Sequence, residues 1–334
     1  SQKSIIFYNK KEEVLVLGTE LKATKEAGIL EFIPFPSEPE VSLAKGNPFE
    51  EVNKLLRIKR IEFEGPIYKG KGGVGGIEPV EIRLSQKIGL HDVTVIKIND
   101  INGFNNWVID FLEKKGFKKI EVKELKNLSA IAEDYIKRGI RYFVFDYVEV
   151  KREPRFIEPL IYRFKTDKLY YPLKTSNIIG GVGRVELVLV LPGSLGINED
   201  ERIRILEAFP EYRRPELSSS SKVYLKELKP IYEKVEDIFT EKDKIYLQVL
   251  RYEGGYEFRD DLNIDISKIA PYARKGGIRI IYTDGLQSIE RDEFLKEPTK
   301  IIKEHIEIIE LLRLWGFTDD EISDYFEAHP ELRK

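Results

Sequence analysis

The sequence predicts an α+β protein made largely of antiparallel sheets with flanking helices. Short runs of β-branched and aromatic residues, separated by polar residues, are typical of strands and fill much of the first half of the chain. Polar turns between neighbouring runs favour hairpins, and hence antiparallel pairing. Apolar residues at helical spacing, with capping residues at their ends, predict helices between and after the strands.

The first half of the chain predicts mostly strands, with three helices among them. Residues 9–11 predict a hairpin turn between the first two strands. The stretch Pro34–Pro39 is too rich in proline for a central strand and should leave the sheet. Asn47 is the expected cap of the first helix, with Pro48 at its first position. The predicted strands are Ser4–Tyr8, Glu13–Leu17, Gly28–Phe35, Val80–Leu84, His91–Ile98 and Tyr142–Val150, and the predicted helices are Pro48–Leu56, Asn105–Lys115 and Leu128–Lys137.

The chain after residue 159 predicts further strands and one longer helix. Leu160–Phe164 and Leu169–Leu173 are interpreted as a second hairpin across a polar turn. Val185–Leu191 is almost entirely apolar, which predicts a strand in the middle of a sheet. The other predicted elements are a helix over Leu225–Phe239 and strands over Lys244–Tyr252 and Ile278–Tyr282.

Two domains are expected, because 334 residues exceed the usual size of one core. A Pro-Gly-Ser-Leu-Gly stretch at residues 192–196 predicts the boundary. It separates a strand-rich domain, 1–195, from an α+β domain, 196–334, that ends in amphipathic helices. Pro298–Trp315 carries the clearest helical spacing, and its wide apolar face predicts an interface with an envelope protein or with a second copy of the chain.

Several segments, taken in order, resemble the uncharacterised domain-of-unknown-function family 2330. The resemblance covers residues 2 to about 195 and continues faintly through Asp260-Asp261-Leu262. It implies an exported or surface-anchored protein and no particular activity. The segments that carry it are Gln2–Tyr8, Glu13–Leu17, Phe32–Val41, Gly89–Val93, the Trp107 helix up to Gly116-Phe117, and Pro159–Leu173.

Composition narrows the class of protein. Charged residues make up 34% of the chain and cysteine is absent, a pattern that favours a thermophile, where charged networks are more useful. The net charge is only −3 and no basic stripe stands out, so we expect no nucleic-acid partner. No apolar run is long enough to predict a membrane-spanning helix. The absence of cysteine excludes thiolate metal sites and cysteine nucleophiles.

A glycine-rich loop, Lys69–Gly76, invites a nucleotide-binding interpretation, because glycines let backbone N–H groups approach phosphates. A Walker loop ends in Gly-Lys-Ser/Thr and leads into a helix. Here the loop leads to Pro79 and a predicted strand, and no Ser or Thr is placed to hold magnesium. A hairpin loop is therefore the preferred interpretation, with nucleotide binding as an alternative.

Alternating oxygen-bearing residues at 260–265 predict a calcium site. Asp261, Asn263 and Asp265 have the spacing of the first half of a calcium loop, and Asp260 adds a carboxylate. Ile266 stands where an EF-hand loop needs glycine, so a solvated strand edge is the competing interpretation.

No catalytic constellation can be assembled from spacing. The three histidines are far apart, and Ser194 lacks the flanking pattern of a nucleophile elbow. We therefore expect a non-catalytic, extracellular or cell-surface protein of a thermophile, with a binding, scaffold or assembly role. The alternatives are an exported hydrolase that uses an unidentified carboxylate pair, and a nucleotide-binding protein that uses the Lys69–Gly76 loop.

Overall fold

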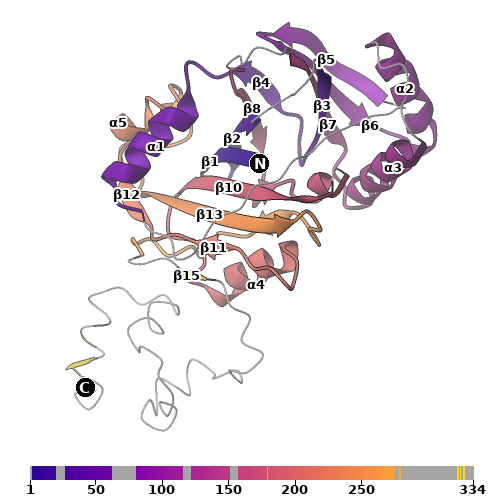
Figure 1. Ribbon diagram of the computed structural model, residues 1–334. Coiled ribbons are helices and arrows are strands. Elements are labelled where there is room, and N and C mark those ends of the chain that lie inside the picture. The colour runs from indigo at the N-terminus through magenta and orange to yellow at the C-terminus, as the bar shows by residue number, and fades with distance from the viewer. Residues whose placement is uncertain are drawn as a thin grey trace.

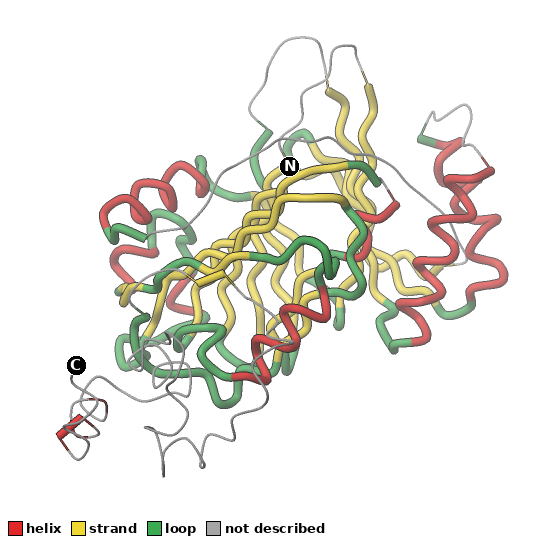
Figure 2. Tube along the Cα trace, turned by 60° about the horizontal axis from the view of Figure 1, so that its bottom comes forward, coloured by secondary structure: helices red, strands yellow, loops and turns green. Residues whose placement is uncertain are grey.

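The chain folds into four layers in the order helices, sheet, sheet, helices (Figure 1). Figure 2 shows the two helical layers on opposite sides of the strands. This arrangement is seen in a computed structural model. The model describes residues 2–19, 27–61, 80–115, 122–150, 157–178, 180–274 and 278–279, and positions 322, 324, 326 and 327. The α+β class predicted from the sequence is confirmed.

The larger sheet has nine strands. They are β1 (Gln2–Tyr8), β2 (Glu12–Thr19), β4 (Glu40–Leu43), β8 (Leu160–Lys165), β10 (Val182–Leu191), β11 (Glu216–Leu217), β12 (Ser221–Val223), β13 (Ile245–Gly255) and β15 (Ile278–Arg279). Their order is β15-β11-β13-β10-β1-β2-β8-β4, and β12 pairs with β13 beside this path. The predicted hairpin of β1 and β2 is confirmed. β1 runs parallel to β10, while the other pairs of this sheet are antiparallel.

The centre of this sheet pairs strands from the two sides of the predicted domain boundary. β10 pairs along its whole length with β13, from Val182 opposite Gly255 to Leu191 opposite Tyr246. The boundary expected near residue 195 lies between these two strands. It therefore does not separate two cores among the described residues, since residues from both sides of it share one buried cluster.

The smaller sheet has the order β3-β7-β6-β5, all antiparallel. Its strands are β3 (Ala27–Phe35), β5 (Val80–Ile88), β6 (His91–Ile98) and β7 (Tyr142–Val150). Pro34 lies in β3 at the edge of the sheet, where a missing N–H is tolerated. A third, two-stranded sheet pairs β9 (Leu169–Tyr171) with β14 (Leu262–Ile264). The predicted hairpin of residues 160–173 is therefore wrong, because β8 pairs with β2 and β4 instead.

Strand alternation divides the buried residues into three clusters. One face of the larger sheet packs against the smaller sheet, with Leu15 and Leu187 on one side and Val95 and Val144 on the other. The opposite face of the larger sheet is covered by α1 (Pro48–Ile58), α5 (Leu225–Leu228) and the 3-10 turn η2 (Val235–Asp237). The outer face of the smaller sheet is covered by α2 (Ile101–Lys114) and α3 (Val122–Lys137).

A row of opposite charges crosses the larger sheet at the edge of its helix-covered face. Lys3, Glu186 and Arg251 are register partners on β1, β10 and β13. Glu186 accepts from Lys3 at 2.8 Å and from Arg251 at 3.2 Å. Burial alone would raise the pKa of Glu186, but the two cations together lower it. The row therefore keeps a half-buried carboxylate ionised where the apolar cover ends.

Several helices differ in their bounds from the predicted ones. The helix expected over Leu225–Phe239 is only α5 and η2, because Pro230 has no N–H and cannot continue a helix. α3 begins at Val122 rather than at Leu128. α4 (Glu199–Ala208) was not predicted. The predicted helix Pro298–Trp315 lies outside the described residues.

The packing of β10 predicts a large cost for truncating a side chain between the sheets. Leu187 is fully buried, so Leu187→Ala should lower the free energy of unfolding by about 2–5 kcal/mol. Val182 on the same strand is 55% exposed, and Val182→Ala should change it by less than about 0.5 kcal/mol. Chemical unfolding of both variants checks this, and equal costs would contradict the two-sheet core.

Candidate functional site

Three ionisable side chains of the smaller sheet project into the layer between the two sheets. His91 lies on β6, Asp146 on β7 and Glu31 on β3. Glu31 and Asp146 are direct cross-strand partners, and His91 shares its sheet face with Val93 and Val95. Because like charges directly opposite each other destabilise an antiparallel pair, two carboxylates here call for a nearby positive group.

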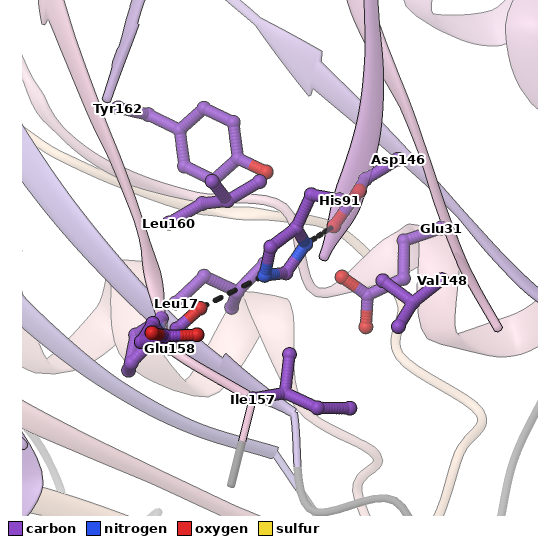
Figure 3. Close-up of a pocket in the computed structure, with 10 residues that line it drawn as sticks. Leu17, Glu31, His91, Asp146, Val148, Ile157, Glu158, Leu160 and Tyr162 are labelled. Carbon is purple, nitrogen blue, oxygen red and sulfur yellow. Dashed lines mark hydrogen bonds and ion pairs between the residues drawn. The ribbon is translucent and has the colours of Figure 1, made fainter. Parts of the chain in front are cut away.

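His91 lies beside Asp146, and both nitrogens of its ring are hydrogen-bonded. Nδ1 lies 2.6 Å from Oδ2 of Asp146, and Nε2 lies 2.8 Å from the backbone oxygen of Glu158 (Figure 3). Both side chains are buried, at 6% and 2% exposure. Glu158 precedes β8 of the larger sheet, so the imidazole connects the smaller sheet to the segment that enters the larger one.

The partners of His91 define where its protons lie. A carbonyl oxygen can only accept, so Nε2 carries a hydrogen and donates it to Glu158. The short contact of Nδ1 with Asp146 then holds a second proton between ring and carboxylate. Burial by itself lowers the pKa of His91, but the hydrogen bond and charge of Asp146 and the bond to Glu158 raise it overall. The pair therefore keeps a proton that a free imidazole would lose.

A cavity of about 10 Å³ adjoins this pair. That is roughly the smallest space that accommodates one water molecule. Two buried polar atoms that line it, Oδ1 of Asp146 and the hydroxyl of Tyr162, have no hydrogen-bond partner within the described part of the chain. Burial raises the pKa of Tyr162 well above its usual value, so its hydroxyl stays a donor. The cavity suits a small bridging molecule such as water.

The groups of this site are enclosed by the protein, and this limits the reactions in which they could take part. Glu31 and Asp146 are a carboxylate pair that the fold brings together, which is the type of group the hydrolase alternative requires. A general base, however, must reach the proton that it abstracts. Nε2 of His91 is occupied by a backbone carbonyl, and the adjoining cavity cannot hold a substrate. In this conformation the groups bind each other.

Sequence reasoning missed this site because it looked for ligand spacing along the chain. A different signal was available for each residue. Glu31 and Asp146 are the single charged residues in the inward phase of β3 and β7, and His91 shares its phase of β6 with Val93, Val95 and Lys97. A charge in such a phase predicts a buried, partnered group. That the three would meet depends on the strand order β3-β7-β6, which local sequence does not encode.

The four residues of the predicted calcium site have different surroundings. Asp261 is buried, and its oxygens accept from the hydroxyl of Tyr135 at 2.7 Å and from the backbone N–H of Lys174 at 3.0 Å. Asp260 and Asp261 both contact Arg138, at 2.6 Å and 3.3 Å. Asn263 and Asp265 are exposed on or beside β14, and Asp265 accepts from the N–H of Ser267. Calcium binding here stays a prediction.

Other candidates from the sequence have simpler outcomes. The Lys69–Gly76 loop lies outside the described residues. Ser194 is fully buried, and its hydroxyl lies against the Ser220 hydroxyl and the Tyr272 carbonyl.

In the described ranges, no helix combines the length and apolarity needed to span a membrane. Over the same ranges, no group of three or more His, Cys, Asp or Glu is arranged to hold a metal ion.

Comparison with known proteins adds little to these observations. No protein-family model matches the chain, and no curated protein matches it. Solved structures of baculovirus P35 show a distant likeness. Two mutated, caspase-cleaved forms have TM-scores of 0.35 and 0.38 at 11% and 10% identity, and cover 79% of this chain and 99% and 97% of theirs. A third P35 structure has a TM-score of 0.32 at 10% identity, with 79% and 95% covered. TM-scores this low establish neither a shared fold nor a shared function.

The His91–Asp146 pair predicts a specific dependence of stability on pH. The folded pKa of His91 is raised above its unfolded value of 6.5, so its contribution is fully present below that pH and is lost as the pH rises through the folded pKa. The Tm of the native chain should therefore fall as the pH rises above neutrality. The double variant His91→Asn with Asp146→Asn should show a smaller fall, measured by thermal melts. Equal pH dependence in both proteins would contradict this account.

Calcium binding at residues 260–265 predicts a higher Tm in millimolar calcium than in EDTA, because a ligand that binds only the folded state stabilises it. Asp265→Asn is the matched variant, since Asp265 is exposed and its removal leaves the contacts of Asp261 intact. This variant should lose the calcium-dependent shift. An unchanged Tm of the native chain would remove calcium from consideration.

Proposed function

We propose that this chain is a non-catalytic cell-surface or extracellular protein of a thermophile, with a binding, scaffold or assembly role. One observation carries the non-catalytic part of the proposal. The described side chains best suited to acid–base or nucleophilic chemistry are buried and engaged with other parts of the chain. His91, Asp146 and Ser194 are examples, each held by neighbouring groups in the interior.

The buried carboxylates follow the same rule. Glu13 is fully buried, which raises its pKa well above its usual value, and it accepts from the backbone N–H of Tyr170. Glu201 is 2% exposed, and burial raises its pKa to about 7. It accepts from the N–H of Gly196 and from the side chain of Asn198, and so holds the turn before α4. Raised pKa values often mark active sites, but these groups have no route to a substrate.

Networks of ion pairs support a rigid protein suited to high temperature. Ion pairs tie together segments that are distant in sequence, as Arg163 does with Glu12 and Asp237. Lys174 and Arg138 similarly share Asp134. Networks of this kind become more favourable as temperature rises, because the cost of desolvating charges falls. A rigid scaffold of this type can present binding residues on its surface.

The cell-surface location rests on the resemblance to family 2330. The expected partners are an envelope protein or a second copy of the chain, bound through the helices that the sequence predicts at the C-terminal end and that lie outside the described residues. The hydrolase alternative has one carboxylate pair in its favour, Glu31 and Asp146, beside a cavity of about 10 Å³ that is too small for a substrate. The nucleotide alternative depends on the loop Lys69–Gly76 and has no described residue in its support.

Fractionation of the native organism tests the location and the role together. The full-length gene product should be recovered with envelope proteins, and cross-linking of intact cells should trap it with an envelope component or with itself. A cytosolic enzyme followed in the same fractions is the control for lysis. Recovery with that control, or recovery at the surface as an uncross-linked species that hydrolyses envelope polymers, would contradict the proposal.

A further inference from the structure

A groove of about 500 Å³ opens to solvent where turns of the two sheets meet. It is lined by the turn between β1 and β2, by the residue that follows β3, and by the end of β8 with the turn after it. Pockets of about this volume accommodate molecules made of several linked groups. We call it the lysine groove, and the residues that line it are Lys10, Lys11, Pro36, Lys165, Thr166 and Asp167.

Hydrogen bonds fix the three segments of the lysine groove relative to one another. The backbone N–H of Thr166 donates to the backbone oxygen of Lys11 at 3.1 Å. The hydroxyl of Ser37 donates to the backbone oxygen of Lys165 at 2.7 Å. The side-chain oxygen of Asn9 accepts from the N–H of Lys11 at 3.0 Å and so holds the turn between β1 and β2. The groove is therefore largely preformed, and a ligand need not order these turns on binding.

The charged side chains of the groove are accessible to a ligand. Lys10, Lys11, Lys165 and Asp167 are all exposed. Within the described ranges, none of the three lysines forms an ion pair, although such pairs are common elsewhere on the protein. Nζ of Lys10 donates to the backbone oxygen of Ser267 at 3.2 Å, which leaves other hydrogens of that ammonium group for a ligand. Three ammonium groups with one carboxylate leave two positive charges uncompensated.

We propose that the lysine groove binds a run of linked phosphate groups in an anionic polymer. This inference rests on the proposed binding role and names the class of its ligand. An ammonium group is a point charge that can meet phosphate oxygens from many directions, whereas a planar carboxylate is matched best by the fork of arginine. The lining consists of lysines without an arginine. The volume of the groove and its two uncompensated charges favour several phosphates over a single ion.

The lysine groove is less suited to a nucleic acid than to other phosphate polymers. Proteins bind single strands through aromatic side chains on which the bases stack, and none of the lining residues is aromatic. The net charge of the chain is −3, so the protein as a whole does not attract a polyanion. Affinity would come from the groove itself, and it would fall as salt screens the lysines.

Isothermal titration of the whole chain with short anions tests the assignment. Tripolyphosphate and tri(glycerol phosphate) represent the two sources of linked phosphates, a polyphosphate and a polyol phosphodiester. Inorganic phosphate is the single-ion comparison, trigalacturonate is the carboxylate comparison, and a thymidine tetranucleotide is the nucleic-acid comparison. At least one of the two linked probes should bind more tightly than all three comparisons, and its affinity should fall as the salt concentration rises. The linked probe that binds more tightly identifies the source.

Charge variants locate the binding in the groove. The double variant Lys11→Ala with Lys165→Ala should weaken binding roughly tenfold, because each exposed ion pair contributes up to about fivefold. Asp167→Asn should tighten binding roughly threefold, because it removes a repulsive carboxylate. Lys87→Ala is the matched control. Lys87 is exposed, has no ion pair within the described ranges, and lies on β5, at the opposite edge of the smaller sheet from β3. This control should leave the affinity within about twofold.

Thermal melts check that each variant is folded, and a gain of affinity in Asp167→Asn is not an effect of misfolding. Failure of both linked probes, equal or tighter binding of any of the three comparisons, or an equal loss in Lys87→Ala would overturn the assignment. Recovery of the chain at the cell surface without phosphate binding would retain the proposed function and remove only this ligand. Binding of linked phosphates by a chain recovered from the cytosol would retain the ligand class and contradict the proposed function.

Discussion

The layer between the two sheets is filled mainly by apolar side chains, and most features of the interior follow from this packing. Side chains of both sheets pack across that layer, from Leu15 and Leu187 to Val95 and Val144. A polar group placed there must find a partner inside the protein or lose hydrogen-bond energy. His91 and Asp146 are such groups, and each supplies the partner that the other needs. The apolar packing requires these two groups to bind each other, and His91 in turn connects the smaller sheet to the segment that enters the larger one.

Asp261 shows how the same constraint ties the layers together. It follows the loop after β13, yet it accepts from Tyr135 and contacts Arg138 at the end of α3 in the outermost layer. Burial raises its pKa to about 6, offset in part by Arg138, by the N–H of Lys174 and by Tyr135. Those donors favour the ionised carboxylate against the effect of burial. Residues 134–138 and 260–261 are held in place by one another, far apart as they are in sequence.

Local sequence predicted the elements far better than their pairing. The inward phases of β1, β2, β6 and β10 are visible as alternating or continuous apolar runs, and the strands form where those runs stand. The parallel pairing of β1 with β10 joins residues more than 170 positions apart and has no local signature. The same limit applies to the site. Glu31, His91 and Asp146 each stand out as charges in apolar strands, but only the strand order places them together.

Buried charges of the larger sheet are paired to different degrees along the strands β10 and β13. Where the apolar cover of α1 and α5 ends, the larger sheet carries Glu186 between Lys3 and Arg251, and these three charges satisfy one another. One step further along β10 and β13, Arg184 and Glu253 do not reach hydrogen-bonding distance. Both carboxylate oxygens of Glu253 are buried without a hydrogen-bond partner in the described part of the chain. Neighbouring rows of the same two strands therefore pair their charges to different degrees, because the separation between the charged groups differs from row to row.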